Sequence, residues 1–295
     1  MPRRRHWHEL PEPVRAEVER RIGPIRSAKT IPTGASCEVA VTLDTATCRL
    51  FCKGGESSSP AAWLYRNEAR VNPWLPEAAP RLLWTVERDG WLLLGFEHVA
   101  GRHPDLAPGS PDLPLLAALL TELSDQLAPC PPLAVRPFAD RWHTLIQPEL
   151  VNGDALLHTD MTPRNFLVPR GRAGAAMRVR LVDWSSPARG AAWIDAALLL
   201  LRLVRAGHTP AAAEAWAMQI PAYASAPEQS VTGFVDALTR LWQRKQLAAP
   251  APHHGPLLDA AQRWAAYRDR AHRSGGSTAP KGTTLKTAEP SAPLR

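Results

Sequence analysis

Three polar side chains that could serve phosphoryl transfer lie in two neighbouring stretches of the chain. Asp160 and Asn165 are five residues apart in a short turn between apolar segments, and Asp183 ends the next apolar segment. A carboxylate can accept the proton of an acceptor hydroxyl, and carboxylate and amide oxygens can hold Mg²⁺ against a triphosphate. The residue types therefore predict Asp160 as the catalytic base and Asn165 and Asp183 as magnesium ligands.

The same turn has a simpler interpretation, because Asp and Asn favour turns for purely local reasons. The position of Asp183 at the end of an apolar strand is what favours catalysis. We expect His158, two residues before Asp160, to pack beside the turn and support it without acting as an acid or a base.

The motif resembles that of a known family. His158, Asp160, Asn165, Asp183 and Trp184 match the pattern His-x-Asp, four residues, Asn, an apolar strand, and then an apolar residue followed by Asp-Trp. This is similar to the aminoglycoside phosphotransferase family, within the protein-kinase-like superfamily that includes choline and homoserine kinases. The resemblance implies ATP and Mg²⁺ as cofactors and transfer of the γ-phosphoryl group to a hydroxyl of a small molecule.

The resemblance also implies roles for residues outside the turn. Asp195 resembles the structural Asp that braces the backbone of the catalytic turn. Lys53 resembles the lysine that binds the α- and β-phosphates, and Glu68 resembles its ion-pair partner. Backbone groups at Gly34 and Ser36 would cover the phosphates, because a loop of small residues can approach them closely. The inter-lobe hinge that meets adenine would be formed by Phe96, Glu97 and His98.

Some positions depart from the family pattern and keep a second function open. Thr159 stands where many members have Gly, Arg164 stands where a small residue is common, and Ser185 and Ser186 follow Asp183 without a second acid. The alternative is a pseudokinase, which would bind a nucleotide and regulate a partner without transferring phosphate. A protein-kinase role is not favoured, because no activation-loop and peptide-anchoring segment follows Asp183.

The spacing of apolar residues predicts the elements that position these groups. Alternation predicts five strands between about residue 29 and residue 96, with a helix at 60–71 inserted after the third. Helical spacing predicts further helices at residues 11–22, 113–127, 194–206, 210–220, 228–247 and 256–272. The expected class is α+β, with a protein-kinase-like bilobal fold: an N-lobe of a five-stranded antiparallel sheet plus a helix (1–97), a mainly helical C-lobe (98–273) and a disordered tail (274–295).

Composition and charge exclude several other classes. The net charge of the 295 residues is +7, but most of the excess lies in residues 1–27 and 274–295, so we expect no nucleic-acid partner. The longest apolar run, residues 194–201, contains Asp195 and is too short to span a bilayer, so we expect no membrane association. The four cysteines form no CxxC pair, which favours reduced thiols and a cytoplasmic location.

The identity of the acceptor is left open by the sequence. A polycationic aminoglycoside would need a pocket lined by carboxylates, and the second lobe contains many acids that could contribute. The basic overall balance argues mildly against a strongly cationic substrate. The candidate acids are Asp105, Asp112, Glu122, Asp125, Asp140, Glu149, Asp154, Glu214 and Asp236.

Overall fold

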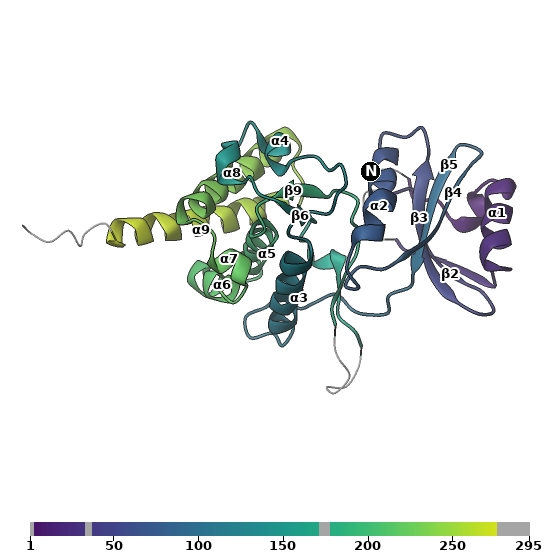
Figure 1. Ribbon diagram of the computed structural model, residues 1–295, viewed down its shortest axis with the longest axis horizontal. Helices are drawn as coiled ribbons and strands as arrows, with labels where there is room; N and C mark the ends of the chain where they lie inside the picture. Colours follow the sequence, from purple (N-terminus) through teal and green to yellow (C-terminus); the bar gives the residue numbers. More distant parts are fainter. Residues whose placement is uncertain (1–2, 33–36, 171–177, 276–295) are drawn as a thin grey trace, which may run out of the picture.

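Five strands form one antiparallel sheet in the first part of the computed structural model, which describes residues 3–32, 37–170 and 178–275 (Figure 1). In space the strands follow the order β1-β2-β3-β5-β4, so β3 is central and β4 and β5 form a hairpin. The alternating pattern and the helix inserted after the third strand are confirmed. The strands are β1 (Ser27–Thr30), β2 (Val39–Asp44), β3 (Arg49–Glu56), β4 (Leu82–Arg88) and β5 (Trp91–Glu97).

Helices cover both faces of this sheet. In Figure 1, α1 (Glu12–Ile22) and α2 (Ala62–Val71) lie on opposite sides of the strands. Val14 and Val18 of α1 are buried in one cluster with Val41, whereas Tyr65 of α2 is buried in another with Ala40. Neighbouring strand residues point to opposite faces, which is why Ala40 and Val41 belong to different clusters.

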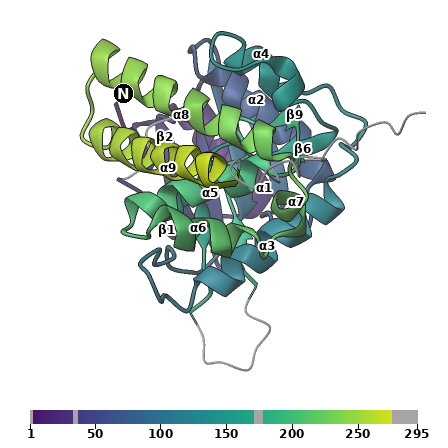
Figure 2. The ribbon, with the colours of Figure 1, turned by 90° about the vertical axis from the view of Figure 1, so that its left-hand side faces the viewer.

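The second lobe is mainly helical and surrounds the largest apolar core. The pair α8 and α9 lies side by side, and α9 also contacts α5 (Figure 2). The helices are α3 (Leu113–Gln126), α4 (Phe138–Trp142), α5 (Ile194–Arg205), α6 (Pro210–Ala217), α7 (Pro221–Ala224), α8 (Glu228–Ala248) and α9 (His254–Gly275). Single 3-10 turns are η1 (Trp7–Glu9), η2 (Asn72–Trp74), η3 (Pro148–Leu150) and η4 (Pro163–Asn165).

Two short ladders in this lobe frame the polar turn found in the sequence. β6 (Ala155–Leu157) pairs with β9 (Ala188–Gly190), and β7 (Phe166–Leu167) pairs with β8 (Arg180–Leu181), both antiparallel. The predicted α+β fold with two lobes is confirmed. The elements α4, α7 and β9 were not predicted, because segments of three to five residues are too short to show a period. The predicted tail began at Ser274, but α9 continues to Gly275, and residues 276–295 lie outside the described part.

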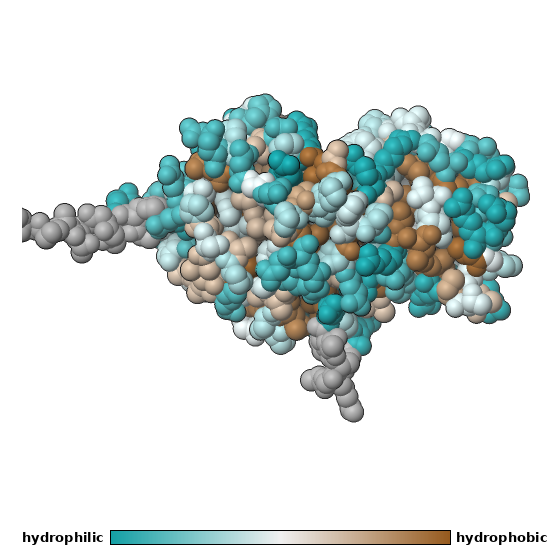
Figure 3. Space-filling model, viewed as in Figure 1, coloured by the Kyte–Doolittle hydropathy of each residue, from teal (hydrophilic) through white to brown (hydrophobic). Residues whose placement is uncertain are grey.

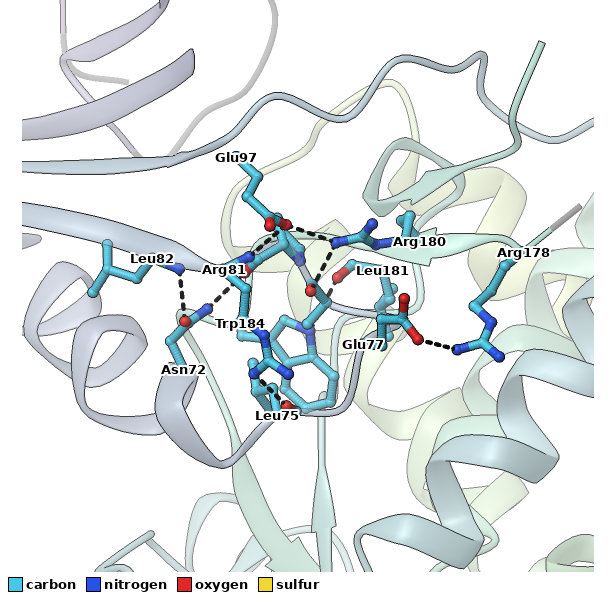
Figure 4. Close-up of polar contacts among 12 residues, drawn as sticks. Asn72, Leu75, Glu77, Arg81, Leu82, Glu97, Arg178, Arg180, Leu181 and Trp184 are labelled. Atoms are coloured by element: carbon cyan, nitrogen blue, oxygen red, sulfur yellow. Dashed lines mark hydrogen bonds and ion pairs between the residues drawn. The ribbon is translucent and has the colours of Figure 1, made fainter. Parts of the chain in front are cut away.

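A polar contact joins the lobes beside the point where the chain crosses between them (Figure 4). The Arg180 guanidinium donates from one nitrogen to the Glu97 carboxylate and to the Ala79 carbonyl, both at 3.0 Å. The Leu181 amide donates to the Ala78 carbonyl at 2.8 Å. We define this set, together with the Arg178–Glu77 ion pair at 2.8 Å, as the inter-lobe strap. We propose the lobe boundary directly after Glu97, where β5 ends.

Two further sequence expectations concern the whole chain. Within the described ranges, none of the helices combines the length and apolar character needed to cross a bilayer. The four cysteines, at positions 37, 48, 52 and 130, are free thiols.

Candidate functional site

Lys53 is the centre of an ion-pair network that joins both lobes. Its ammonium lies 2.5 Å from the Glu68 carboxylate of α2 and 2.7 Å from the Asp183 carboxylate of the second lobe. Lys53 and Glu68 are only 7% and 3% exposed, so the pair is sheltered from water. The backbone amide of Trp184 donates to the second oxygen of Glu68 at 3.2 Å, which completes the connection between the lobes.

The network determines the charge states of its members. Burial disfavours the charge on Lys53, but Asp183 and Glu68 outweigh it, so the pKa of the ammonium lies above its ordinary value. Burial also acts against ionisation of Asp183, and the Lys53 charge overcomes it and lowers the pKa of that carboxyl to about 2. For Glu68, burial dominates over Lys53 and raises the pKa to about 7. Asp183 is therefore the member held most firmly as a carboxylate.

The turn that carries Asp160 is fixed by hydrogen bonds from its own side chains. The Asn165 amide nitrogen donates to the Asp160 carbonyl at 2.9 Å, so Asn165 and Asp160 are held together as the motif spacing suggested. The Asp160 amide donates to Nδ1 of His158 at 3.2 Å. Since Nδ1 accepts, Nε2 carries the proton and donates to the Val182 carbonyl at 3.0 Å. His158 thus links the turn to the segment that ends at Asp183.

Asp195, the first acid of α5, bonds the backbone just before Asp160. Its two carboxylate oxygens accept from the amides of His158 and Thr159 at 2.8 and 2.9 Å. Thr159 has a left-handed φ of 70°, which is unfavourable for a β-branched residue. Its hydroxyl donates to the Ser186 carbonyl at 2.7 Å, so side-chain contacts hold a backbone conformation that glycine adopts more readily.

A cavity of about 290 Å³ lies between the lobes and contains most of the predicted residues. The space-filling view shows the surface notched where the two lobes meet (Figure 3). Lys53, Glu68, Asn165 and Asp183 line it, whereas the predicted base Asp160 does not. The remaining lining includes the predicted hinge residues Phe96, Glu97 and His98, followed by Val99, and the apolar side chains Ala40, Leu167 and Val182.

Similarity to known proteins is detectable in the three-dimensional structure but not in the sequence. No family model and no curated protein matches the chain. Choline kinase LicA from Streptococcus pneumoniae superposes with a TM-score of 0.59 at 13% identity, over 87% of this chain and 99% of that one. A thermostable mutant of aminoglycoside phosphotransferase APH(4)-Ia gives 0.56 at 15% identity, over 89% and 99%. This chain has their protein-kinase-like fold.

A putative aminoglycoside phosphotransferase from Ralstonia eutropha has the same fold, with a TM-score of 0.52 at 12% identity over 86% of this chain and 93% of that one. The resemblance drawn from the motif is therefore confirmed at the level of the fold. Within the kinase-like fold, the predicted phosphate-covering residues Gly34 and Ser36 lie outside the described residues. Glu97, a predicted hinge residue, also makes side-chain contacts that were not predicted, because its carboxylate accepts from the Arg81 amide at 3.0 Å and from Arg180 in the inter-lobe strap.

Arg141 of α4 contacts the turn that carries Asp160, and the sequence did not reveal this contact. Its guanidinium donates to the Thr159 hydroxyl at 3.2 Å and to the carbonyl and hydroxyl of Ser186 at 3.0 and 2.9 Å. Burial lowers the pKa of Arg141 from its ordinary value. Thr159 and Ser186, which both depart from the family pattern, thus bond the same arginine. No sequence pattern marks Arg141 as their partner.

Replacing Asp195 by Ala is expected to lower the free energy of unfolding by about 2–3 kcal/mol, because two backbone N–H groups lose their acceptors. The burial that raises the pKa of Asp195 limits the loss, since the substitution also removes a buried carboxylate. Asp195→Asn keeps one acceptor oxygen and should lose less. Denaturant unfolding measures both, with Asp259→Ala as the control because that acid is exposed on α9. Equal stability of Asp195→Ala and wild type would contradict the bracing role.

Proposed function

We propose that this chain is a phosphotransferase that moves the γ-phosphoryl group of ATP, with Mg²⁺, to a hydroxyl of a small molecule. The observation that carries the proposal is that Lys53, Asn165 and Asp183 line one cavity between the lobes, while Asn165 holds the turn of Asp160 beside it. The fold alone does not decide function, because related folds host different activities. The presence of these three polar groups in one cavity, with Asn165 bonded to the backbone of Asp160, supports a phosphoryl-transfer site.

The cavity has properties that suit a nucleotide. One part is lined by apolar side chains and by the backbone of residues 96–99, which can contact an adenine ring and its hydrogen-bonding edge. The other part carries the Lys53 ammonium, whose raised pKa keeps it charged beside phosphates. Choline kinase LicA has been solved with AMP, and APH(4)-Ia has been solved with AMP-PNP and hygromycin B. These complexes support ATP as the donor here.

The residues fit magnesium in the manner of a nucleotide-bound ion. The described ranges contain no cluster of three or more His, Cys, Asp or Glu side chains able to hold a metal. Mg²⁺ in kinases is bound by one or two protein oxygens together with the phosphates, and Asn165 and Asp183 can supply two. Asp183 stays ionised because of Lys53. When bound, the ion neutralises charge on the phosphates.

The protein groups would divide the remaining tasks among them. Lys53 binds the phosphates, and Glu68 orients the ammonium from α2. Asp160 accepts the proton of the acceptor hydroxyl as the oxygen attacks phosphorus. His158, Asn165 and Asp195 position the turn through the hydrogen bonds described above, so that little reorganisation accompanies the reaction.

Thermal unfolding with nucleotide tests the binding half of this function. ATP with Mg²⁺ is expected to raise the melting temperature of the wild type more than ATP with EDTA does. Asp183→Ala should abolish this difference, because it removes the anionic magnesium ligand. Asp259→Ala is the matched control, since Asp259 is exposed on α9 and far along the chain from the motif. A magnesium-dependent shift that survives in Asp183→Ala would refute the assignment of Asp183.

Transfer of labelled γ-phosphate to a panel of alcohols tests the catalytic half. Binding of Mg·ATP with no transfer and no hydrolysis would instead identify the chain as a pseudokinase, the alternative that Thr159 and Ser185 leave open.

A further inference from the structure

Two cations of the second lobe share one tryptophan and lie near the proposed catalytic turn. The Arg202 guanidinium of α5 lies 5.6 Å from the ring centre of Trp242, and the Lys245 ammonium of α8 lies 4.8 Å from the same ring. Cations are attracted to the face of an indole ring, so Trp242 holds both charges in one place. We refer to Arg202, Lys245 and Trp242 as the cationic cluster.

Arg202 of the cationic cluster lies on α5, the helix that begins beside the turn of Asp160. Arg202 follows Asp195 by seven residues, so the two side chains lie on one face of α5, two turns or about 10 Å apart. Asp195 in turn bonds the backbone of His158 and Thr159. Burial lowers the pKa of Arg202 and of Lys245, and the Asp160 carboxylate opposes that lowering because it favours their charged forms. Arg202 and Lys245 are thus basic groups within electrostatic reach of Asp160.

Neither cation has a carboxylate partner among the described residues, although other arginines of the lobe do. Burial lowers the pKa of Arg202 to about 10, despite the opposing effect of Asp160, so its charge is costly to keep in this position. In the same cluster, Trp242 Nε1 is buried and has no hydrogen-bond partner in the described structure; the same is true of Nδ1 of the adjacent His254. The Trp242 N–H is therefore a buried donor without an acceptor, which an acceptor atom of a ligand would satisfy.

Four of the nine acids that could have bound a cationic acceptor form ion pairs elsewhere. Asp112 forms an ion pair with Arg102 at 2.6 Å, and Glu214 forms one with Arg268 at 2.8 Å. Glu122 and Asp154 lie 3.6 and 3.7 Å from Arg178 and Arg189. The described part of the second lobe therefore presents positive charge near Asp160 and neutralises several of its acids at other places.

We propose that the acceptor is an anionic alcohol, a hydroxyl compound that carries a carboxylate or a phosphate, with its anionic group on Arg202 and Lys245 and its hydroxyl at Asp160. This inference rests on the proposed function. Arg202 can bind such a group through two parallel hydrogen bonds, and Lys245 adds a second charge. The proton of the hydroxyl passes to Asp160, the hydroxyl oxygen bonds to the γ-phosphorus, and ADP leaves.

Paired probes that differ only in charge test the proposal. We would use glycerol, glycerate, glycerol 3-phosphate and 3-amino-1,2-propanediol, and corresponding sets built on hexoses: the sugar, its 6-phosphate, its uronic acid and its amino sugar. Binding to the Mg·ADP-loaded protein is measured by calorimetry, and transfer is measured with labelled ATP. We expect the anionic members to bind at least 10-fold more tightly than their neutral and cationic counterparts.

Variants of Arg202 and Lys245 test whether these two residues bind the anionic probes. Arg202→Gln and Lys245→Gln should each weaken binding of the anionic probes by about 10- to 100-fold, the loss typical of a charge-assisted hydrogen bond. Arg202→Lys should retain part of the affinity and guards against misfolding as the cause. Arg244→Gln is the matched control, because it removes the same charge from α8 at a side chain that bonds Thr144 instead.

The binding measurement tests the anionic acceptor site independently of the proposed phosphotransferase activity. If no anionic probe binds more tightly than its neutral counterpart, or if Arg202→Gln binds the probes as the wild type does, the anionic acceptor site is refuted. Failure of the proposed function has another signature, which is the absence of Mg·ATP binding and of transfer to every probe. Anion binding at Arg202 without transfer would keep the anion site and refute the phosphotransferase.

Discussion

Asp160→Asn is expected to lower the rate of phosphoryl transfer by about 10²- to 10⁴-fold, the contribution typical of a positioned general base. Asparagine has nearly the shape of aspartate but cannot accept the proton of the attacking hydroxyl. The backbone of the turn should persist, because it is held by Asn165, His158 and Asp195 and not by the Asp160 side chain. The loss should therefore appear in kcat, with the affinity for Mg·ATP unchanged.

Steady-state transfer with labelled ATP, together with a melting curve in Mg·ATP, measures both parts of this prediction. Asp125→Asn provides the control, since that acid lies on the exposed side of α3. Transfer by a folded Asp160→Asn protein within a few-fold of the wild-type rate would remove Asp160 from the chemistry.

Lys53→Met is expected to reduce the free energy of unfolding by about 3–5 kcal/mol, besides weakening nucleotide binding. Removing one partner of a buried ion pair leaves the other charge without compensation. Here two carboxylates, Glu68 and Asp183, lose the same ammonium, and Glu68 is almost fully buried. The double variant Lys53→Met with Glu68→Gln should recover part of the stability, because it removes one of the uncompensated charges.

Denaturant unfolding of the two single variants and the double variant forms a thermodynamic cycle. A large coupling energy is expected, since the two side chains are in contact. Lys29→Met is a suitable control because Lys29 is exposed on β1 of the same sheet. A double variant less stable than Lys53→Met by the full effect of Glu68→Gln would contradict the coupling.

The sequence was sufficient to predict the fold class and the longer elements. The alternating segments and the hairpin turns predicted the five strands because one face of each strand is buried. The motif predicted one cleft for Asp160, Asn165 and Asp183; Asn165 bonds the Asp160 carbonyl, and Asn165 and Asp183 line one cavity. Lys53 and Glu68 could be assigned only through the family resemblance, and the structure brings their charges together with Asp183.

Contacts between distant segments could not be predicted from one sequence. Arg141 lies on a helix of five residues, and nothing in its neighbourhood marks a partner at Thr159 or Ser186. Arg202 resembles an ordinary helical arginine until α8 brings Trp242 and Lys245 beside it. These side-chain contacts depend on how the helices pack against one another. The period of apolar residues predicts which face of a helix is buried, but it does not predict which polar side chains meet at the edge of that face.

If a nucleotide binds as proposed, the inter-lobe strap restricts how it enters and leaves. Arg180 binds Glu97 and Ala79 where the chain passes from β5 into the second lobe, so a polar link lies beside the covalent one (Figure 4). Opening the lobes about that edge would separate Lys53 from Asp183 and break their ion pair. Product release would accordingly begin at the phosphate end and leave the adenine end until last.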